Sequence, residues 1–80
     1  MITLHVSYFA ILREQRGLSQ ETLTTNAATP TALYEELRAR HAFSLPAARV
    51  RAAVNDEFVA SDAALREGDR VVFIPPVAGG

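Results

Sequence analysis

The hydrophobic pattern at the start of the chain has the period of a half-buried β-strand. Every second residue from Ile2 to Tyr8 is apolar, and polar residues lie between them. Phe9 then falls on the polar side of this strand, where it either contacts a partner or packs under the helical stretch expected for residues 10–15. Gly17 suits the left-handed conformation that ends such a stretch.

The rest of the chain combines strand patterns with one longer helical pattern. Thr29-Pro30-Thr31 starts a helix, because proline is tolerated in the first turn, and apolar residues then recur at helical spacing as far as His41. A brief turn through residues 63–65 is also expected. Strands are predicted at residues 21–25, 50–54, 70–74 and from residue 58 onward.

The resulting order, ββαββ with the last strand parallel to the first, describes an α+β fold of the β-grasp (ubiquitin-like) type. We expect a mixed sheet of four to five strands with one main helix packed on one face. The final strand, residues 70–74, is apolar on both sides, so Ile74 lies on the uncovered face, beside Phe9 if this strand is next to the first. We interpret that face as a partner-binding patch rather than as an ordinary sheet centre.

Composition and charge argue against several classes of function. The 80 residues fit one small domain, carry a formal net charge of −1 and include no cysteine. We therefore expect no nucleic-acid or membrane partner, no disulfide and a cytoplasmic protein. His5 and His41 lie on different predicted elements without an acidic cluster, so no metal site is expected. No nucleophile or phosphate-binding motif is present, which predicts that the chain is not catalytic alone.

The end of the sequence points to chemistry at a terminal carboxylate. Pro75 and Pro76 fix φ and cannot continue a strand, so residues 75–80 are predicted to leave the domain of residues 1–74 as a stiffened arm. Gly79 and Gly80 have no Cβ and leave the carboxylate sterically bare. An ionised carboxylate can attack a phosphate and so become an activated acyl group. We prefer this interpretation to a frayed terminus, because a strand runs directly into the prolines.

Five short segments carry a resemblance to a known family. They are Tyr8-Phe9-Ala10, Leu12-Arg13-Glu14, Ala53-Val54-Asn55, Glu67-Gly68-Asp69 and the last eight residues, Phe73-Ile74-Pro75-Pro76-Val77-Ala78-Gly79-Gly80. Together they resemble the small subunits of molybdopterin synthase, which are ubiquitin-like sulfur carriers. The resemblance runs essentially from Met1 to Gly80.

The resemblance implies a function for the end of the chain. Gly80, preceded by Gly79, would be adenylated by an ATP-dependent, E1-like activating enzyme and converted to a thiocarboxylate with sulfur from a donor protein. It would then enter the large catalytic subunit of the heterotetrameric synthase, where the sulfur passes to cyclic pyranopterin monophosphate in molybdenum cofactor biosynthesis. The chain itself would bind no cofactor. The family's partner-facing positions fall on Phe9, Arg13, Phe58, Ile74, Pro75, Pro76, Val77 and Ala78, the last of which is often Ser or Thr in the family.

Three other functions stay open. A related β-grasp sulfur carrier for thiamin or another pathway would share Gly79-Gly80. We rank this alternative below the molybdopterin synthase subunit because of the Pro75-Pro76-Val77 run. A ubiquitin-like conjugator would use the same activation step but attach Gly80 to lysines of target proteins. A non-reactive interaction module would tolerate extra residues after Gly80.

Overall fold

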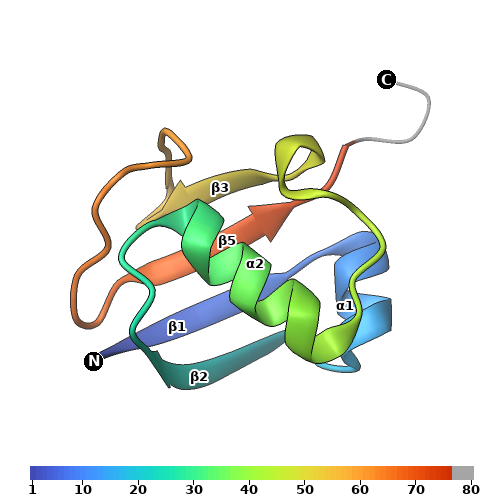
Figure 1. Ribbon diagram of the computed structural model, residues 1–80, viewed down its shortest axis with the longest axis horizontal. Helices are drawn as coiled ribbons and strands as arrows, with labels where there is room; N and C mark the ends of the chain where they lie inside the picture. The colour runs from blue at the N-terminus through green and yellow to red at the C-terminus, as the bar shows by residue number, and fades with distance from the viewer. Residues whose placement is uncertain (77–80) are drawn as a thin grey trace.

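The chain forms a five-stranded mixed β-sheet crossed on one face by a helix (Figure 1). The computed structural model describes residues 1–76. The elements in chain order are β1 (Ile2–Tyr8), α1 (Ala10–Arg16), β2 (Gln20–Thr25), α2 (Pro30–His41), the short 3-10 helix η1 (Ala47–Arg49), β3 (Arg51–Val54), β4 (Glu57–Phe58) and β5 (Arg70–Ile74). The strand order is β2-β1-β5-β3-β4, in which β1 and β5 are parallel and all other pairs are antiparallel. The predicted β-grasp fold is therefore confirmed.

The hydrophobic core lies between α2 and the sheet. Leu33, Tyr34 and Leu37 of α2 are almost completely buried, as their helical spacing predicts. The sheet contributes Leu4, Val6, Tyr8, Val71 and Phe73. Burying a side chain of this kind stabilises the fold by roughly 1.5–3 kcal/mol. The core thus fixes β5 directly beside β1, so Ile74 lies at the end of the central strand of the sheet.

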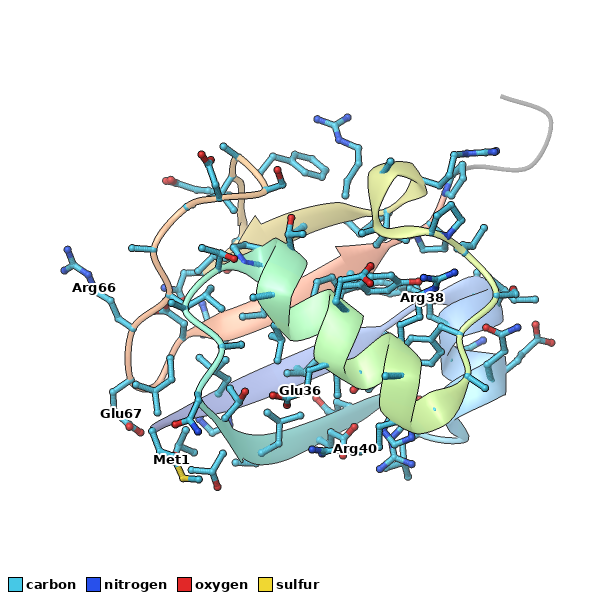
Figure 2. The ribbon with its side chains drawn as sticks, viewed as in Figure 1. Met1, Glu36, Arg38, Arg40, Arg66 and Glu67 are labelled. Atoms are coloured by element: carbon cyan, nitrogen blue, oxygen red, sulfur yellow. The ribbon has the colours of Figure 1, made fainter. Side chains whose placement is uncertain are left out.

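Helix α2 is fastened to the sheet at its polar edge as well. The Thr25 hydroxyl at the end of β2 donates a hydrogen bond to Glu36 Oε1 at 2.9 Å. Glu36 also forms an i,i+4 ion pair with Arg40, with 3.7 Å between Arg40 Nη2 and Glu36 Oε2 (Figure 2). Within residues 1–76, neither helix has the length and apolar character needed to cross a membrane.

The connections differ from the sequence prediction in three places. The Asn55-Asp56 turn is as predicted, and the positive φ angles of both residues, 51° and 72°, are those of a tight hairpin turn. The strand after it, however, is only Glu57–Phe58, and η1 was not predicted. Residues 63–65 form no helical turn, because the backbone N–H of Leu65 donates to Ala28 O and ties this loop to the segment before α2.

The C-terminal ends of α1 and α2 adopt the left-handed conformation, one at a glycine and one at an alanine. Gly17 has φ 84°, where a Cβ would meet no other atom within 4 Å, and Ala42 has φ 56°. We expect Gly17→Ala to lower the free energy of unfolding by about 1 kcal/mol through backbone strain alone. The reverse substitution, Ala42→Gly, should raise it by about 0.5 kcal/mol, because relief of strain exceeds the added entropy of the unfolded chain. Urea denaturation of both variants measures this, and equal shifts in the same direction would contradict it.

Candidate partner-binding site

The sheet face opposite α2 is divided into a polar half and an apolar half. Directly paired residues share a face, so the strand register assigns each side chain to one side of the sheet. On β2 and β1 this face carries threonine, glutamine, serine and histidine side chains. On β5, β3 and β4 it carries Val72, Ile74, Ala53 and Phe58, together with Arg51 and Arg70. The apolar half therefore belongs to the strands that surround the end of β5.

Phe9 extends this apolar half beyond the end of β1. Its backbone is extended, so its side chain lies on the face opposite to that of the buried Tyr8. Because Tyr8 is paired with Phe73, Phe9 comes beside Ile74. Phe9 is 49% exposed and Phe58 60%, which is unusual for large aromatic side chains. We define the apolar patch as Phe9, Ala53, Phe58, Val72 and Ile74.

A hollow at the end of β5 adjoins the apolar patch. Its volume is about 510 Å³, which is sufficient for several side chains of a partner. The lining is Phe9, Ala10, Ile11, Leu45, Ile74, Pro75 and Pro76. Pro75 is buried and Pro76 is exposed. The predicted site residues Val77, Ala78, Gly79 and Gly80 lie outside the described residues.

The two other predicted contact residues in the described part of the chain, Arg13 and Phe58, lie outside the lining of this hollow. Arg13 is exposed on α1 and is not part of the lining. Phe58 lies on β4, two strands away from Ile74, and the gap between them is filled by Arg51, whose guanidinium lies 4.5 Å from the centre of the Phe58 ring. Sequence reasoning did not select Arg51, although its alternation with Ala52 already assigned it to this face. Leu45 belongs to a loop and gave no periodic signal.

A polar triad supports the segment that carries Phe9. The Tyr8 hydroxyl donates a 2.6 Å hydrogen bond to Glu21 Oε2, and Arg16 donates two bonds of 2.8 Å to the same carboxylate. The hydrogen bonds from Arg16 lower the pKa of Glu21 to about 2, and burial raises the pKa of Tyr8. Burial also lowers the pKa of the neighbouring His41. The triad joins β1, α1 and β2 and so holds the start of α1 against the end of the sheet.

Glu21 makes folding sensitive to acid. Its carboxylate titrates near 4.5 when unfolded and near 2 when folded, so its contribution is complete above pH 4.5 and is lost as the pH falls toward 2. We expect the urea midpoint of the wild-type chain to fall more steeply over this range than that of Glu21→Gln, which lacks the titrating group. Parallel pH profiles of the two proteins would contradict this.

The part of the chain that the structure describes does not bring metal-ligating side chains together. No group of three metal-ligating side chains occurs among residues 1–76. His5 contacts the Thr22 hydroxyl at 3.0 Å on the polar half of the sheet face, and His41 packs near the Phe43 ring at the end of α2. The two histidines are thus on opposite faces of the sheet and share no site.

Comparison with known proteins places this geometry among sulfur carriers and their relatives. A family model described as "ThiS family" matches residues 6–80. The molybdopterin synthase sulfur carrier subunits of Escherichia coli K12 and Haemophilus influenzae are 36% and 32% identical to the chain, and each alignment covers 96% of this chain and 99% of the relative. These matches confirm the resemblance inferred from the sequence.

A solved structure shows the same fold over nearly all of the chain. It is a Pyrococcus furiosus protein provisionally described as molybdopterin converting factor, subunit 1, and it is 31% identical in sequence. The superposition has a TM-score of 0.78 and covers 96% of this chain and all of the other. The arrangement of sheet and helix is therefore shared with that protein.

Proposed function

The chain belongs to the ThiS family, and on that premise we propose that it is the sulfur carrier subunit of a molybdopterin synthase. The observation that carries this proposal is the 36% identity, over nearly the full length of both chains, to a molybdopterin synthase sulfur carrier subunit. The apolar patch supports it, because a carrier with no catalytic groups of its own must dock on the proteins that act on it. The reacting group in this proposal is the carboxylate of Gly80.

The chemistry begins with activation of that carboxylate. A carboxylate is a poor electrophile, so its oxygen attacks the α-phosphate of ATP in the E1-like activating enzyme, forming an acyl adenylate and releasing pyrophosphate. A sulfur nucleophile from the donor protein then attacks the acyl carbon, and AMP leaves with the electron pair of the broken C–O bond. When the attacking atom is the outer sulfur of a persulfide on the donor, a thiol then cleaves the S–S bond of the acyl disulfide, which leaves a C-terminal thiocarboxylate on the chain and a disulfide on the donor.

The thiocarboxylate then acts inside a second partner, the large catalytic subunit. There its sulfur attacks cyclic pyranopterin monophosphate, and subsequent hydrolysis regenerates the carboxylate of Gly80. The residues after Ile74 number six, so a fully extended tail spans at most about 20 Å. The folded domain therefore stays outside the catalytic cavity while Gly80 reaches its interior.

The folded domain contributes position rather than catalysis. Docking through a rigid face fixes where the tail begins, which raises the effective concentration of the terminal sulfur at the acceptor. Pro75 and Pro76 shorten the flexible part of the tail and reduce the entropy lost on insertion. The buried position of Pro75 against the hollow supports this role, because it ties the base of the tail to the sheet.

Intact-mass measurement tests the proposal directly. The chain is incubated with ATP, the activating enzyme of the same organism and a sulfur donor, and we expect a mass increase equal to the replacement of one oxygen by sulfur. Addition of the large subunit and cyclic pyranopterin monophosphate should return the mass to its starting value. No mass change would contradict the proposal, and covalent attachment of Gly80 to lysines of other proteins would favour a conjugator instead.

A further inference from the structure

Arg51 places a positive charge within the outline of the apolar patch. It is directly opposite Ile74 in the pairing of β3 with β5, and Ala53, two residues later, is opposite Phe58. The Arg51 guanidinium lies over the Phe58 ring, 4.5 Å from its centre. The charge is therefore between Phe58 and Ile74, the two residues expected to dock on a partner.

The charge of Arg51 is not neutralised within residues 1–76. The other arginine on this face, Arg70, forms an ion pair with Asp56 at 3.1 Å, whereas Arg51 has no carboxylate within ion-pair distance in the described part of the chain. A guanidinium stacked on an aromatic ring keeps N–H donors available in its own plane. Arg51 is thus held by Phe58 in a position from which it can still donate hydrogen bonds.

Docking through the apolar patch would remove this charge from water. A partner that covers both Phe58 and Ile74 also covers Arg51, which lies between them. An unpaired charge in a buried interface is strongly unfavourable, whereas a carboxylate held by two parallel N–H···O bonds compensates its desolvation. A wholly apolar partner surface would therefore bind this chain poorly.

We propose that Arg51 is a specificity-determining residue of the docking face, and that the protein receiving the tail presents an aspartate or glutamate carboxylate to its guanidinium. The partner surface then consists of an apolar area, complementary to the patch, with one acidic side chain inside it. Phe58 has two roles in this arrangement, since its ring is part of the patch and also orients Arg51. The inference rests on the proposed function in taking the patch as the docking face of the carrier.

Arg51→Met is the discriminating variant. Methionine keeps an unbranched apolar side chain over Phe58 but removes the charge, so only a partner carboxylate would be left unpaired. We expect affinity for the large subunit of the same organism, measured by calorimetry, to fall about 10- to 100-fold. Arg51→Lys should lose about tenfold, because an ammonium cannot form the two parallel bonds.

Arg66→Met is the matched control. Arg66 is exposed on the loop before β5, and Figure 2 shows it at the side of the molecule away from the end of β5. We expect this variant to bind as the wild-type chain does. The affinity of the wild-type chain should also fall more steeply with added salt than that of Arg51→Met.

The outcomes separate this inference from the proposed function. Unchanged or tighter binding by Arg51→Met, or an equal loss in Arg66→Met, would overturn the role of Arg51 even if the wild-type chain is thiocarboxylated normally. A wild-type chain that neither binds the large subunit nor gains sulfur would overturn both. Thermal unfolding of each variant shows whether a loss of affinity comes from the interface, and Arg51→Met should unfold at the wild-type temperature.

Discussion

Removal of Gly80 is expected to abolish sulfur transfer while leaving the free energy of unfolding unchanged. The deletion moves the terminal carboxylate back by one residue, about 3.5 Å along an extended chain. A misplacement of 1 Å can already reduce the rate of a positioned reaction about 100-fold, so the shortened tail should be inactive with both partners. The core residues among residues 1–76 lie between α2 and the sheet, and the deletion removes none of them, which is why stability should not change.

Two further variants of the C-terminus distinguish the position of the terminal carboxylate from the identity of the last residue. Adding one alanine after Gly80 keeps a carboxylate but shifts and crowds it, so activation by ATP should also be lost. Gly80→Ala keeps the carboxylate at its place and adds only a Cβ, and we expect part of the activity to remain. Intact mass after incubation with the activating enzyme measures all three variants. Normal sulfur gain by the chain that lacks Gly80 would refute the assignment of the reacting group.

Ile74→Arg is expected to weaken binding of the large subunit by about 100-fold or more. Ile74 lies at the centre of the arrangement, since it belongs to the apolar patch, lines the hollow and is the last residue of β5. Truncating a central interface residue commonly costs about 2 kcal/mol or more, which is about 30-fold, and a second charge beside Arg51 adds repulsion. Because Ile74 is only half-buried, the free energy of unfolding should fall by about 1 kcal/mol at most.

Thr22→Arg serves as the control for this substitution. Thr22 is exposed on β2, on the polar half of the same sheet face, and a change to the same side chain there should leave affinity unaffected. Phe58→Arg should behave like Ile74→Arg, because it removes both an exposed apolar surface and the ring that holds Arg51. If Ile74→Arg and Phe58→Arg unfold the protein as strongly as they weaken binding, the apolar patch is structural and not a docking face.

The polar triad that supports the binding site was harder to predict from the sequence than the binding site itself. Tyr8, Arg16 and Glu21 belong to three different elements, and their spacing follows no single period. Their contact depends on where α1 turns after Phe9 relative to β2. A polar group of this kind can be recognised only once the tertiary structure brings the elements together.

By itself, the sequence determined the main strands and helices, their order and which side of the sheet most residues occupy. The period of two in residues 2–8 and the helical spacing of Leu33 and Leu37 depend on local geometry, so both survive without knowledge of the fold. The turn at Asn55-Asp56 follows from residues that tolerate positive φ. The apolar character of both sides of β5 likewise indicated an uncovered face before the strand order was known.

Only the tertiary structure decided which residues on that face are neighbours. Alternation assigns Arg51, Phe58 and Ile74 to the same side but does not say that β3 lies between β4 and β5, because strand register is set by hydrogen bonds between segments far apart in sequence. The contributions of Leu45 and Pro75 to the hollow depend equally on where a loop and a chain end pack. The physical reason is that periodicity reports the local environment of a residue, whereas a binding site is defined by non-local contacts.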